Sequence, residues 1–217
     1  MNKIKNIIIK NLKWLVAFIC VIVFLMFAED VFTKEIMLVD ITGYDFISKY
    51  IISENLTPIV KFITNLGGTI FLISLTILLL IIFLFKFKNK KIGFAIVINI
   101  INSALLNMIL KNILQRPRPE EFRIISVTGY SFPSGHSMNS MAFYGFLIYL
   151  IYIKIENKYI KWALISILSV LIILVGISRI YLGVHYTSDV LAGFLISIVY
   201  LILYINIINQ KFNLEIF

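Results

Sequence analysis

The sequence predicts an all-α integral membrane protein, a bundle of six transmembrane helices with a helical segment along the membrane interface after the first span. Composition is one reason, because 60% of the 217 residues are hydrophobic and 14% are charged, and the mean hydropathy is +0.98, beyond an ordinary soluble domain. The apolar residues also form blocks long enough to cross hydrocarbon as helices. Without a repeat or a linker, one membrane-embedded domain over residues 1–217 is expected.

Six apolar blocks account for the predicted spans, and their edges are approximate because flanking side chains can snorkel or extend a helix. The first block follows a basic stretch, as in a secretory signal. Met26 stands where a cleavage site needs a small residue, which favours an uncleaved span. The blocks run over about Trp14–Ala28, Thr69–Phe85, Ile92–Leu110, Met138–Ile153, Trp162–Ile177 and Val190–Ile205.

The distribution of charge between alternate loops predicts the orientation of the chain. With the N-terminus inside, 12 of the 20 Lys and Arg residues lie on the inside, whereas nine of the 11 acids lie outside. Cytoplasmic loops carry the excess of basic residues in membrane proteins. We therefore expect cytoplasmic N- and C-termini, with the loops after the first, third and fifth spans on the outer face.

Residues 29–68 are too polar to span a membrane, but they mix aromatic and aliphatic side chains with charges. This mixture is typical of a segment at the membrane interface. Two interpretations remain open for it. The segment forms a lid over a lipid entry, or it is a plain pair of connecting helices.

Composition also argues against several function classes. The net charge of +9 could indicate nucleic-acid binding, but the basic residues cluster in short loops, where topology and anionic lipid headgroups explain them better. Cys20 is the only cysteine and lies inside an apolar block, so neither a disulfide framework nor a cysteine metal site is available. We expect no nucleic-acid partner, no metal and no cofactor.

The arginines of the chain are concentrated in the two outside loops that follow the third and fifth spans, while every other basic residue is lysine. A planar guanidinium binds two phosphate oxygens at once, which an ammonium group does not. A cluster of arginines therefore indicates phosphate recognition, although an interface that binds lipid headgroups would also use it. The four are Arg116, Arg118, Arg123 and Arg179.

The two histidines of the chain lie in these same outside loops. His136 directly precedes the fourth span, where Ser134 can cap a helix and Gly135 permits close approach of the backbone. The free N–H groups of a helix N-terminus bind anions. Taken alone, the motif is also compatible with an ordinary capped helix beside an interfacial histidine.

The second histidine, His185, has an aspartate four residues later, Asp189. On a helix this spacing places both side chains on one face. A carboxylate on one ring nitrogen fixes the tautomer, so that the other nitrogen presents its lone pair to an electrophile. The alternative is a surface His/Asp pair without chemistry.

A polar stripe marks the third span. Asn99, Ser103, Asn107 and Lys111 recur every four residues, so the stripe is expected to face the interior of the bundle. A polar contact between helices would equally explain the stripe, and a snorkelling side chain would explain Lys111.

Together these segments resemble the three-part signature of the type 2 phosphatidic acid phosphatase superfamily. In order, the chain has K-x6-R-P at Lys111–Pro119, P-S-G-H at Pro133–His136 and S-R-x5-H-x3-D at Ser178–Asp189. Every motif position is matched, and an ordered threefold match is highly specific. The resemblance covers residues 111–193 and the six-helix frame.

The resemblance implies a role for each motif residue. His185 would be the nucleophile that forms a phosphohistidine, and Asp189 would orient it. His136 would protonate the leaving lipid oxygen and later activate water. The groups that would bind the phosphate oxygens are Lys111, Arg118, Ser134, Gly135 and Arg179.

The implied function is a metal-independent membrane lipid phosphatase in a bacterial cytoplasmic membrane, acting on substrates from the outer leaflet. Phosphatidic acid, phosphatidylglycerol phosphate and a polyprenyl pyrophosphate are the candidate substrates, and an enzyme dedicated to undecaprenyl pyrophosphate is an alternative. A non-catalytic lipid-phosphate binder or transporter has little use for two histidines and an orienting aspartate. The motifs set neither the lipid group nor the oligomeric state.

Overall fold

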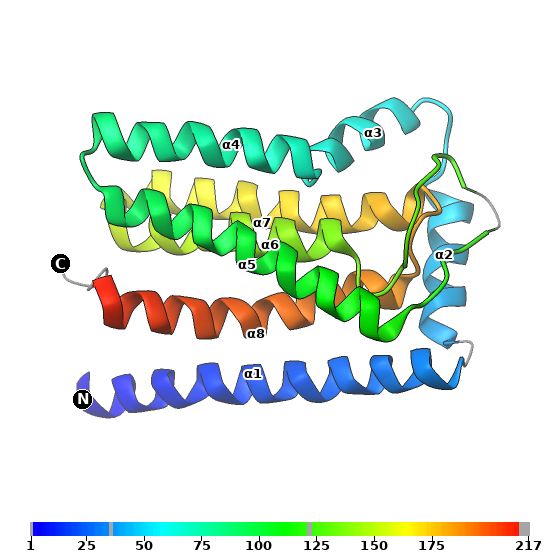
Figure 1. Ribbon diagram of the computed structural model, residues 1–217, viewed down its shortest axis with the longest axis horizontal. Helices are drawn as coiled ribbons and strands as arrows, with labels where there is room; N and C mark the ends of the chain where they lie inside the picture. The colour runs from blue at the N-terminus through cyan, green and yellow to red at the C-terminus, as the bar shows by residue number, and fades with distance from the viewer. Residues whose placement is uncertain (1, 35–36, 121–122, 213–217) are drawn as a thin grey trace.

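The computed structural model describes residues 2–34, 37–120 and 123–212, with side chains from residue 11 onward. Within these ranges the chain forms eight α-helices and one short π-helix, so the predicted all-α class is confirmed. Six long helices run along the molecule, and α2 stands across one end (Figure 1). The helices are α1 Asn2–Thr33, α2 Leu38–Tyr50, α3 Thr57–Leu66, α4 Thr69–Ile81, η1 Ile82–Lys86, α5 Lys90–Leu114, α6 Gly135–Lys154, α7 Lys158–Tyr181 and α8 Thr187–Phe212.

Five of the long helices are apolar and long enough to cross a membrane, namely α1, α4 with η1, α5, α7 and α8. Five of the six predicted spans therefore correspond to candidate membrane-crossing helices, and the sixth, on α6, does not. α6 has 20 residues, but its first turns bury small polar side chains such as Ser137 and Ser140. Because α6 packs against α5, α7 and α8, these residues face protein and lower the hydropathy of the helix.

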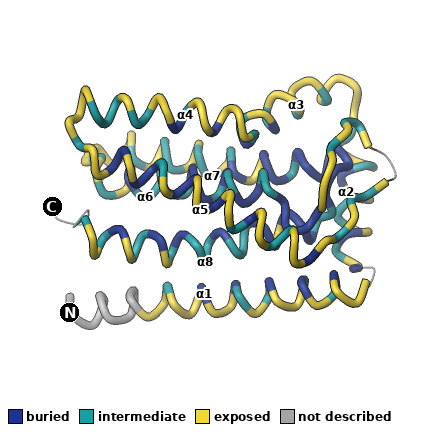
Figure 2. The backbone as a smooth tube through the Cα atoms, viewed as in Figure 1, coloured by how far each residue is buried: buried dark blue, intermediate teal, exposed yellow. Residues whose placement is uncertain are grey.

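The outer surface of the bundle is apolar where lipid would lie. Figure 2 shows exposed residues along much of α1 and α4, while buried residues concentrate on α5, α6 and α8. Large hydrophobic side chains such as Phe18, Leu25 and Ile77 are exposed on these outer helices. A surface of this kind is matched to hydrocarbon rather than to water.

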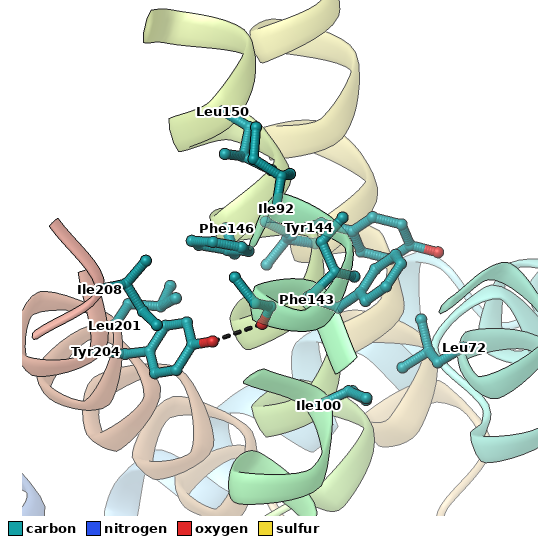
Figure 3. Packing of buried hydrophobic residues seen from close by; sticks show 13 residues of the cluster. Leu72, Ile92, Ile100, Phe143, Tyr144, Phe146, Leu150, Leu201, Tyr204 and Ile208 are labelled. Carbon is teal, nitrogen blue, oxygen red and sulfur yellow. Dashed lines mark hydrogen bonds between the residues drawn. The ribbon is translucent and has the colours of Figure 1, made fainter. Parts of the chain in front are cut away.

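The main core lies toward the end of the bundle opposite α2. Phe143, Phe146 and Tyr204 pack there among aliphatic side chains from α5, α6 and α8 (Figure 3). The rings of Phe146 and Tyr204 meet edge to face with their centroids 5.4 Å apart, and the Tyr204 hydroxyl donates to the backbone carbonyl of Ala95. Aromatic packing of this kind fixes the spacing of the three helices.

The polar stripe of α5 faces the interior, as predicted. Asn99, Ser103 and Asn107 are all buried, and each bonds to α6 or to the loop before it. The Asn99 amide donates to the carbonyl of Ala142 at 2.8 Å, and the Asn107 amide donates to the carbonyl of Pro133 at 3.1 Å. The stripe therefore fixes the position of α6 relative to α5.

The segment between α1 and α4 forms the helices α2 and α3 at one end of the bundle (Figure 1). Tyr181, at the end of α7, anchors it. The Tyr181 hydroxyl donates to the carbonyl of Ser53 at 2.8 Å, accepts from the Ser53 amide at 3.1 Å and lies 3.0 Å from the Thr57 hydroxyl. The helical part of the prediction for residues 29–68 is confirmed for α2 and α3.

Candidate active site

The three motif segments meet at the end of the bundle that carries α2. They are the end of α5 with the segment that follows it, the start of α6, and the turn between α7 and α8 (Figure 1). A cavity of about 1230 Å³ opens there between the end of α1, α2, the end of α5 with the segment that follows it, and the turn between α7 and α8; Arg116, Arg118 and His185 line it. Two of the arginines and one of the two histidines thus lie at the wall of one large cavity.

His185 and Asp189 form the predicted pair. His185 lies in the turn before α8, and Asp189 lies in the first turn of that helix, so the spacing of four places both on one side. The Nδ1 atom of His185 is 3.1 Å from Oδ2 of Asp189, and both side chains are buried. The Tyr186 amide donates to the same carboxylate oxygen at 2.9 Å, which fixes its position further.

Arg118 identifies the tautomer of His185. Its Nη1 atom lies 3.0 Å from Nε2 of His185, and it also donates to the carbonyl of Val184 at 2.7 Å. A guanidinium carries only donors, so Nε2 must accept and be unprotonated. The ring proton is then on Nδ1, facing Asp189, and the Nε2 lone pair faces the Arg118 guanidinium.

The charge state of His185 suits a nucleophile. Burial lowers the pKa of His185 below its usual 6.5, and this effect exceeds the opposing effect of the Asp189 carboxylate. The ring is therefore neutral at physiological pH, with an unprotonated Nε2 whose lone pair accepts from Arg118. A neutral imidazole held by a carboxylate can attack an electrophile.

The N-terminus of α6 is capped by Ser134 and joined to α8. The hydroxyl of Ser134 accepts from the amide of Ser137 at 3.4 Å, and the Ser134 amide donates to the backbone carbonyl of Asp189 at 3.0 Å. A Cβ atom on Gly135 would lie 2.9 Å from Oδ1 of Asn107, so a larger residue there would displace the Asn107 amide that donates to Pro133. Helix N-termini with unpaired N–H groups favour negative charge.

Lys111 and Arg179 approach the site from α5 and α7. The Lys111 amine donates to the carbonyls of Tyr130 and Ser131, at 3.0 Å for Ser131. Arg179 is buried and donates from Nη1 to the Thr64 hydroxyl at 2.8 Å, while its Nε has no partner among the described residues. Both cations are thus held at the site with donor capacity to spare.

The predicted site residues form one electrostatic cluster, but they do not all line the large cavity. His136 interacts electrostatically with Arg179, His185, Arg118 and Lys111. Of these five, only Arg118 and His185 line the cavity. In the part of the chain that the structure describes, no three His, Cys, Asp or Glu side chains are grouped so that they could hold a metal ion.

Two residues around Asp189 lie outside the motif positions. The Ser131 hydroxyl donates to Oδ2 of Asp189 and lies 3.3 Å from Nδ1 of His185. Arg116 donates from Nη1 to the other carboxylate oxygen, Oδ1, at 2.7 Å. Burial lowers the pKa of Arg116, but the carboxylates of Asp189 and Asp40 outweigh it and raise that pKa, so this cation is permanent.

Comparison with known proteins decides the family. The model of the PAP2 superfamily matches residues 92–213, more than half of the chain. The chain belongs to the PAP2 superfamily. The resemblance seen in the three motifs is therefore confirmed, and this PAP2 protein is a multi-pass integral membrane protein.

Relatives agree with this placement. Phosphatidylglycerophosphatase B of Bacillus subtilis is 36% identical over 141 residues, covering 64% of this chain and 68% of the relative. An undecaprenyl-diphosphatase of Sulfolobus acidocaldarius is 28% identical over 117 residues, about half of each chain, at 51% and 52%. The crystal structure of the transmembrane PAP2-type phosphatidylglycerolphosphate phosphatase from Bacillus subtilis superposes with a TM-score of 0.75 at 29% identity, covering 89% of this chain and 96% of that one. This PAP2 protein is thus a lipid phosphate phosphatase, a membrane hydrolase.

Proposed function

We propose that the protein removes a terminal phosphate from a membrane lipid through a phosphohistidine formed on His185. The observation that carries this proposal is the pair of contacts on the His185 ring. Asp189 lies on Nδ1, and the donor Arg118 lies on Nε2. The unprotonated nitrogen is thus aimed at the Arg118 guanidinium, a group that binds phosphate oxygens.

Two steps with His136 as the proton carrier complete the reaction. In the first, Nε2 of His185 attacks phosphorus, the bond between phosphorus and the lipid oxygen breaks, and His136 donates a proton to that oxygen. In the second, water attacks the phosphohistidine, His136 takes the proton from the water, and inorganic phosphate leaves with His185 restored. The charge balances in both steps, because one proton is lent and then recovered.

The basic residues stabilise the charge on the transferring phosphate. Lys111, Arg118 and Arg179 come from three segments; Arg118 contacts Nε2 of His185, and the charges of Lys111 and Arg179 both act on that of Arg118. The start of α6 adds Ser134 and the Gly135 amide. Donors fixed before the substrate arrives stabilise a transition state at little reorganisation cost.

For the substrate we propose a phospholipid monoester, phosphatidylglycerol phosphate or phosphatidic acid. The support is the similarity to phosphatidylglycerophosphatase B in both sequence and fold. The second candidate is a polyprenyl pyrophosphate such as undecaprenyl pyrophosphate, favoured by the similarity to an undecaprenyl-diphosphatase. Both present a terminal phosphate at the interface and both leave a lipid-bound oxygen.

We propose that α6 is a sixth crossing and that the site lies on the outer face of a bacterial cytoplasmic membrane. The six long helices alternate in direction, so that α1 begins and α8 ends at the end of the bundle opposite α2 (Figure 1). That end also carries the loops rich in lysine, which favours a cytoplasmic location. Substrates would then come from the outer leaflet.

Purified protein in detergent tests the activity. Phosphate release from phosphatidylglycerol phosphate, phosphatidic acid and undecaprenyl pyrophosphate is measured with excess chelator, and kcat/KM is compared between the substrates. We expect release by the wild type and by the control Glu54→Gln, an exposed carboxylate at the same end of the molecule, and none by His185→Ala. Undiminished release by His185→Ala would overturn the nucleophile assignment, and abolition by chelator would contradict the metal-independent mechanism.

A labelled substrate separates the enzyme from a lipid-phosphate binder. The wild type quenched during turnover with lipid carrying a radioactive terminal phosphate should retain label on the protein, and His185→Ala should not. A wild type that binds the lipid tightly without ever becoming labelled would indicate the binder.

Topology is tested by placing one cysteine at Glu120 in a Cys20→Ser background. Glu120 lies on the exposed segment beside the cavity. A reagent that does not cross membranes should label it in intact cells. Labelling only after lysis would place the site on the cytoplasmic face.

A further inference from the structure

The carboxylate of Asp189 is held by a second carboxylate that lies on another helix. Asp40, in the first turn of α2, accepts from Nη2 of Arg116 at 2.6 Å, and Nη1 of the same guanidinium donates to Asp189 at 2.7 Å. Asp40 also accepts from the amide of Ser188 at 2.7 Å and from its hydroxyl at 3.0 Å. One arginine thus joins α2 to the first turn of α8.

These groups are buried, so their charges act strongly on one another. Asp189 is fully buried, Asp40 is 7% exposed, and the side chain of Arg116 is 11% exposed. The ring of Tyr186 covers the guanidinium, with Cζ 3.9 Å from the ring centroid. Away from water, a charge that loses its partner has no solvent to replace it.

The sum of the charges explains why a second carboxylate is useful. Asp189 and Arg116 alone are neutral as a pair, which leaves little negative potential for the His185 ring. With Asp40 the three groups carry a net charge of −1. That charge can then stabilise the positive charge that develops on the ring when Nε2 attacks.

The packing of α2 against the start of α8 fixes the position of Asp40. Gly43 lies one turn after Asp40 on the same helix, and a Cβ atom there would lie 2.2 Å from Oγ1 of Thr187. The helix can approach the start of α8 so closely only because this position is glycine. The contact keeps Asp40 within hydrogen-bonding distance of Ser188 and Arg116.

We propose that Asp40, acting through Arg116, is a positioning residue for the reaction, which makes α2 a part of the catalytic apparatus rather than only a connector. Asp40 neutralises Arg116 and orients it, so that Asp189 keeps both its charge and its hydrogen bond for His185. The inference rests on the proposed function of His185 as the nucleophile. Asp40 touches neither substrate nor reacting atoms in this role.

The decisive experiment compares Asp40→Asn with the double variant Asp40→Asn/Arg116→Gln. Asparagine keeps the shape of Asp40 but leaves the charge of Arg116 unbalanced beside Asp189, so kcat should fall about tenfold, by analogy with the loss when groups that orient a metal-bound histidine are changed. KM should stay nearly constant. Removing the arginine charge as well restores the net charge of −1, so the double variant should recover to within about threefold of the wild type.

A purely structural bridge gives the opposite result for the double variant, because both partners are then damaged. A double variant that is as slow as Asp40→Asn, or slower, would overturn the proposal, and so would an Asp40→Asn variant with wild-type kcat. The control is Glu54→Gln, which removes an exposed carboxylate at the same end and should leave kcat unchanged. Melting temperatures in detergent establish that each variant is folded.

A spectroscopic readout separates this proposal from the proposed function. The chain has only two histidines, so protein labelled with ¹⁵N-histidine gives two sets of ring signals. The Nδ1 proton of His185 should resonate far downfield in the wild type, move upfield in Asp40→Asn and return in the double variant. If the wild type shows this pattern of chemical shifts but releases no phosphate, the positioning role is supported and the proposed function fails. If the chemical shift of the Nδ1 proton is the same in all variants, the positioning role is wrong.

Discussion

The two ends of the bundle are held together in different ways. At the end opposite α2, aromatic and aliphatic side chains such as Phe146 and Tyr204 pack between α5, α6 and α8 (Figure 3). At the end that carries α2, buried charges are joined in pairs, with Arg116 between Asp40 and Asp189. Apolar packing thus stabilises the end opposite α2, whereas the paired charges shape the candidate active site at the end that carries α2.

Substitutions at the two ends of the bundle are expected to have different costs. Packing loses a limited amount of free energy for each atom removed, and neighbouring side chains partly adjust. A buried charge tolerates far less, because removing one partner leaves the other without compensation. Variants at the two ends are therefore expected to separate activity from stability.

The largest expected effect is at Asp189. In Asp189→Asn the side-chain amide would donate to Nδ1 of His185, so the ring proton would move to Nε2 and the nucleophile would lose its lone pair. We expect kcat to fall by about 10⁴-fold, as for the equivalent change in a serine protease triad. Steady-state phosphate release measures it, with a melting curve to establish folding. A fall of less than tenfold would contradict the tautomer derived from Arg118.

The next effect is at the other end of the bundle. Phe146 is fully buried, and Phe146→Ala should lower the free energy of unfolding by about 3 kcal/mol, the low end of the range for such changes, because packing rather than transfer from water is lost within a membrane. Activity per folded molecule should be unchanged. Phe18→Ala, at a side chain 62% exposed on α1, is the matched control and should have little effect. Equal loss in both would mean that the core does not lie where the structure places it.

The pH dependence of kcat/KM tests only the end of the bundle that carries His185. His185 must be neutral to attack, and burial lowers the pKa of His185 below 6.5. A lowered pKa means that the neutral form persists to more acidic pH, so the acid limb of kcat/KM should lie below pH 6.5. At a pH one unit below 6.5 the rate should be about tenfold higher than an ordinary histidine would allow. An acid limb at or above 6.5 would show that His185 is not desolvated.

The smallest effect concerns the hydrogen bond from Tyr204 to Ala95. Tyr204→Phe keeps the ring in the core and removes only this bond, so the free energy of unfolding should fall by about 1 kcal/mol with no change in kcat. Tyr159→Phe, at a side chain 86% exposed, should cost nothing. Chemical denaturation in detergent compares the two. A change in kcat in Tyr204→Phe would indicate that the two ends are coupled.

Much of the fold was predictable because local patterns carry it. The apolar blocks predict the long helices, and the four-residue repeat of Asn99, Ser103 and Asn107 predicts which face of α5 is buried. α6 is where this reasoning is incomplete. Its inner face packs against three helices rather than lipid, so α6 is less hydrophobic than the helices that could cross a membrane. It nevertheless runs through the bundle in the direction expected of a sixth span.

The site divides in the same way. The motifs identify His185, Asp189 and Arg118, which the structure places in contact, because their spacing along the chain fixes their chemistry. They do not identify Ser131, which contacts Asp189 from 58 residues away in sequence, or Asp40, which is linked to Asp189 only through Arg116. Such pairings depend on how α2 packs over the end of the bundle. The clustering of arginines did point to Arg116, but not to its partners.

The contact between Gly43 and Thr187 has a consequence for how this protein can diverge. A lineage that replaces Gly43 by a larger residue must move α2 away from the start of α8, and Asp40 then leaves Arg116. Positions 40, 43 and 116 should therefore be inherited together or lost together. Among relatives, a side chain at the position of Gly43 would mark those in which the aspartate equivalent to Asp189 is held by other contacts.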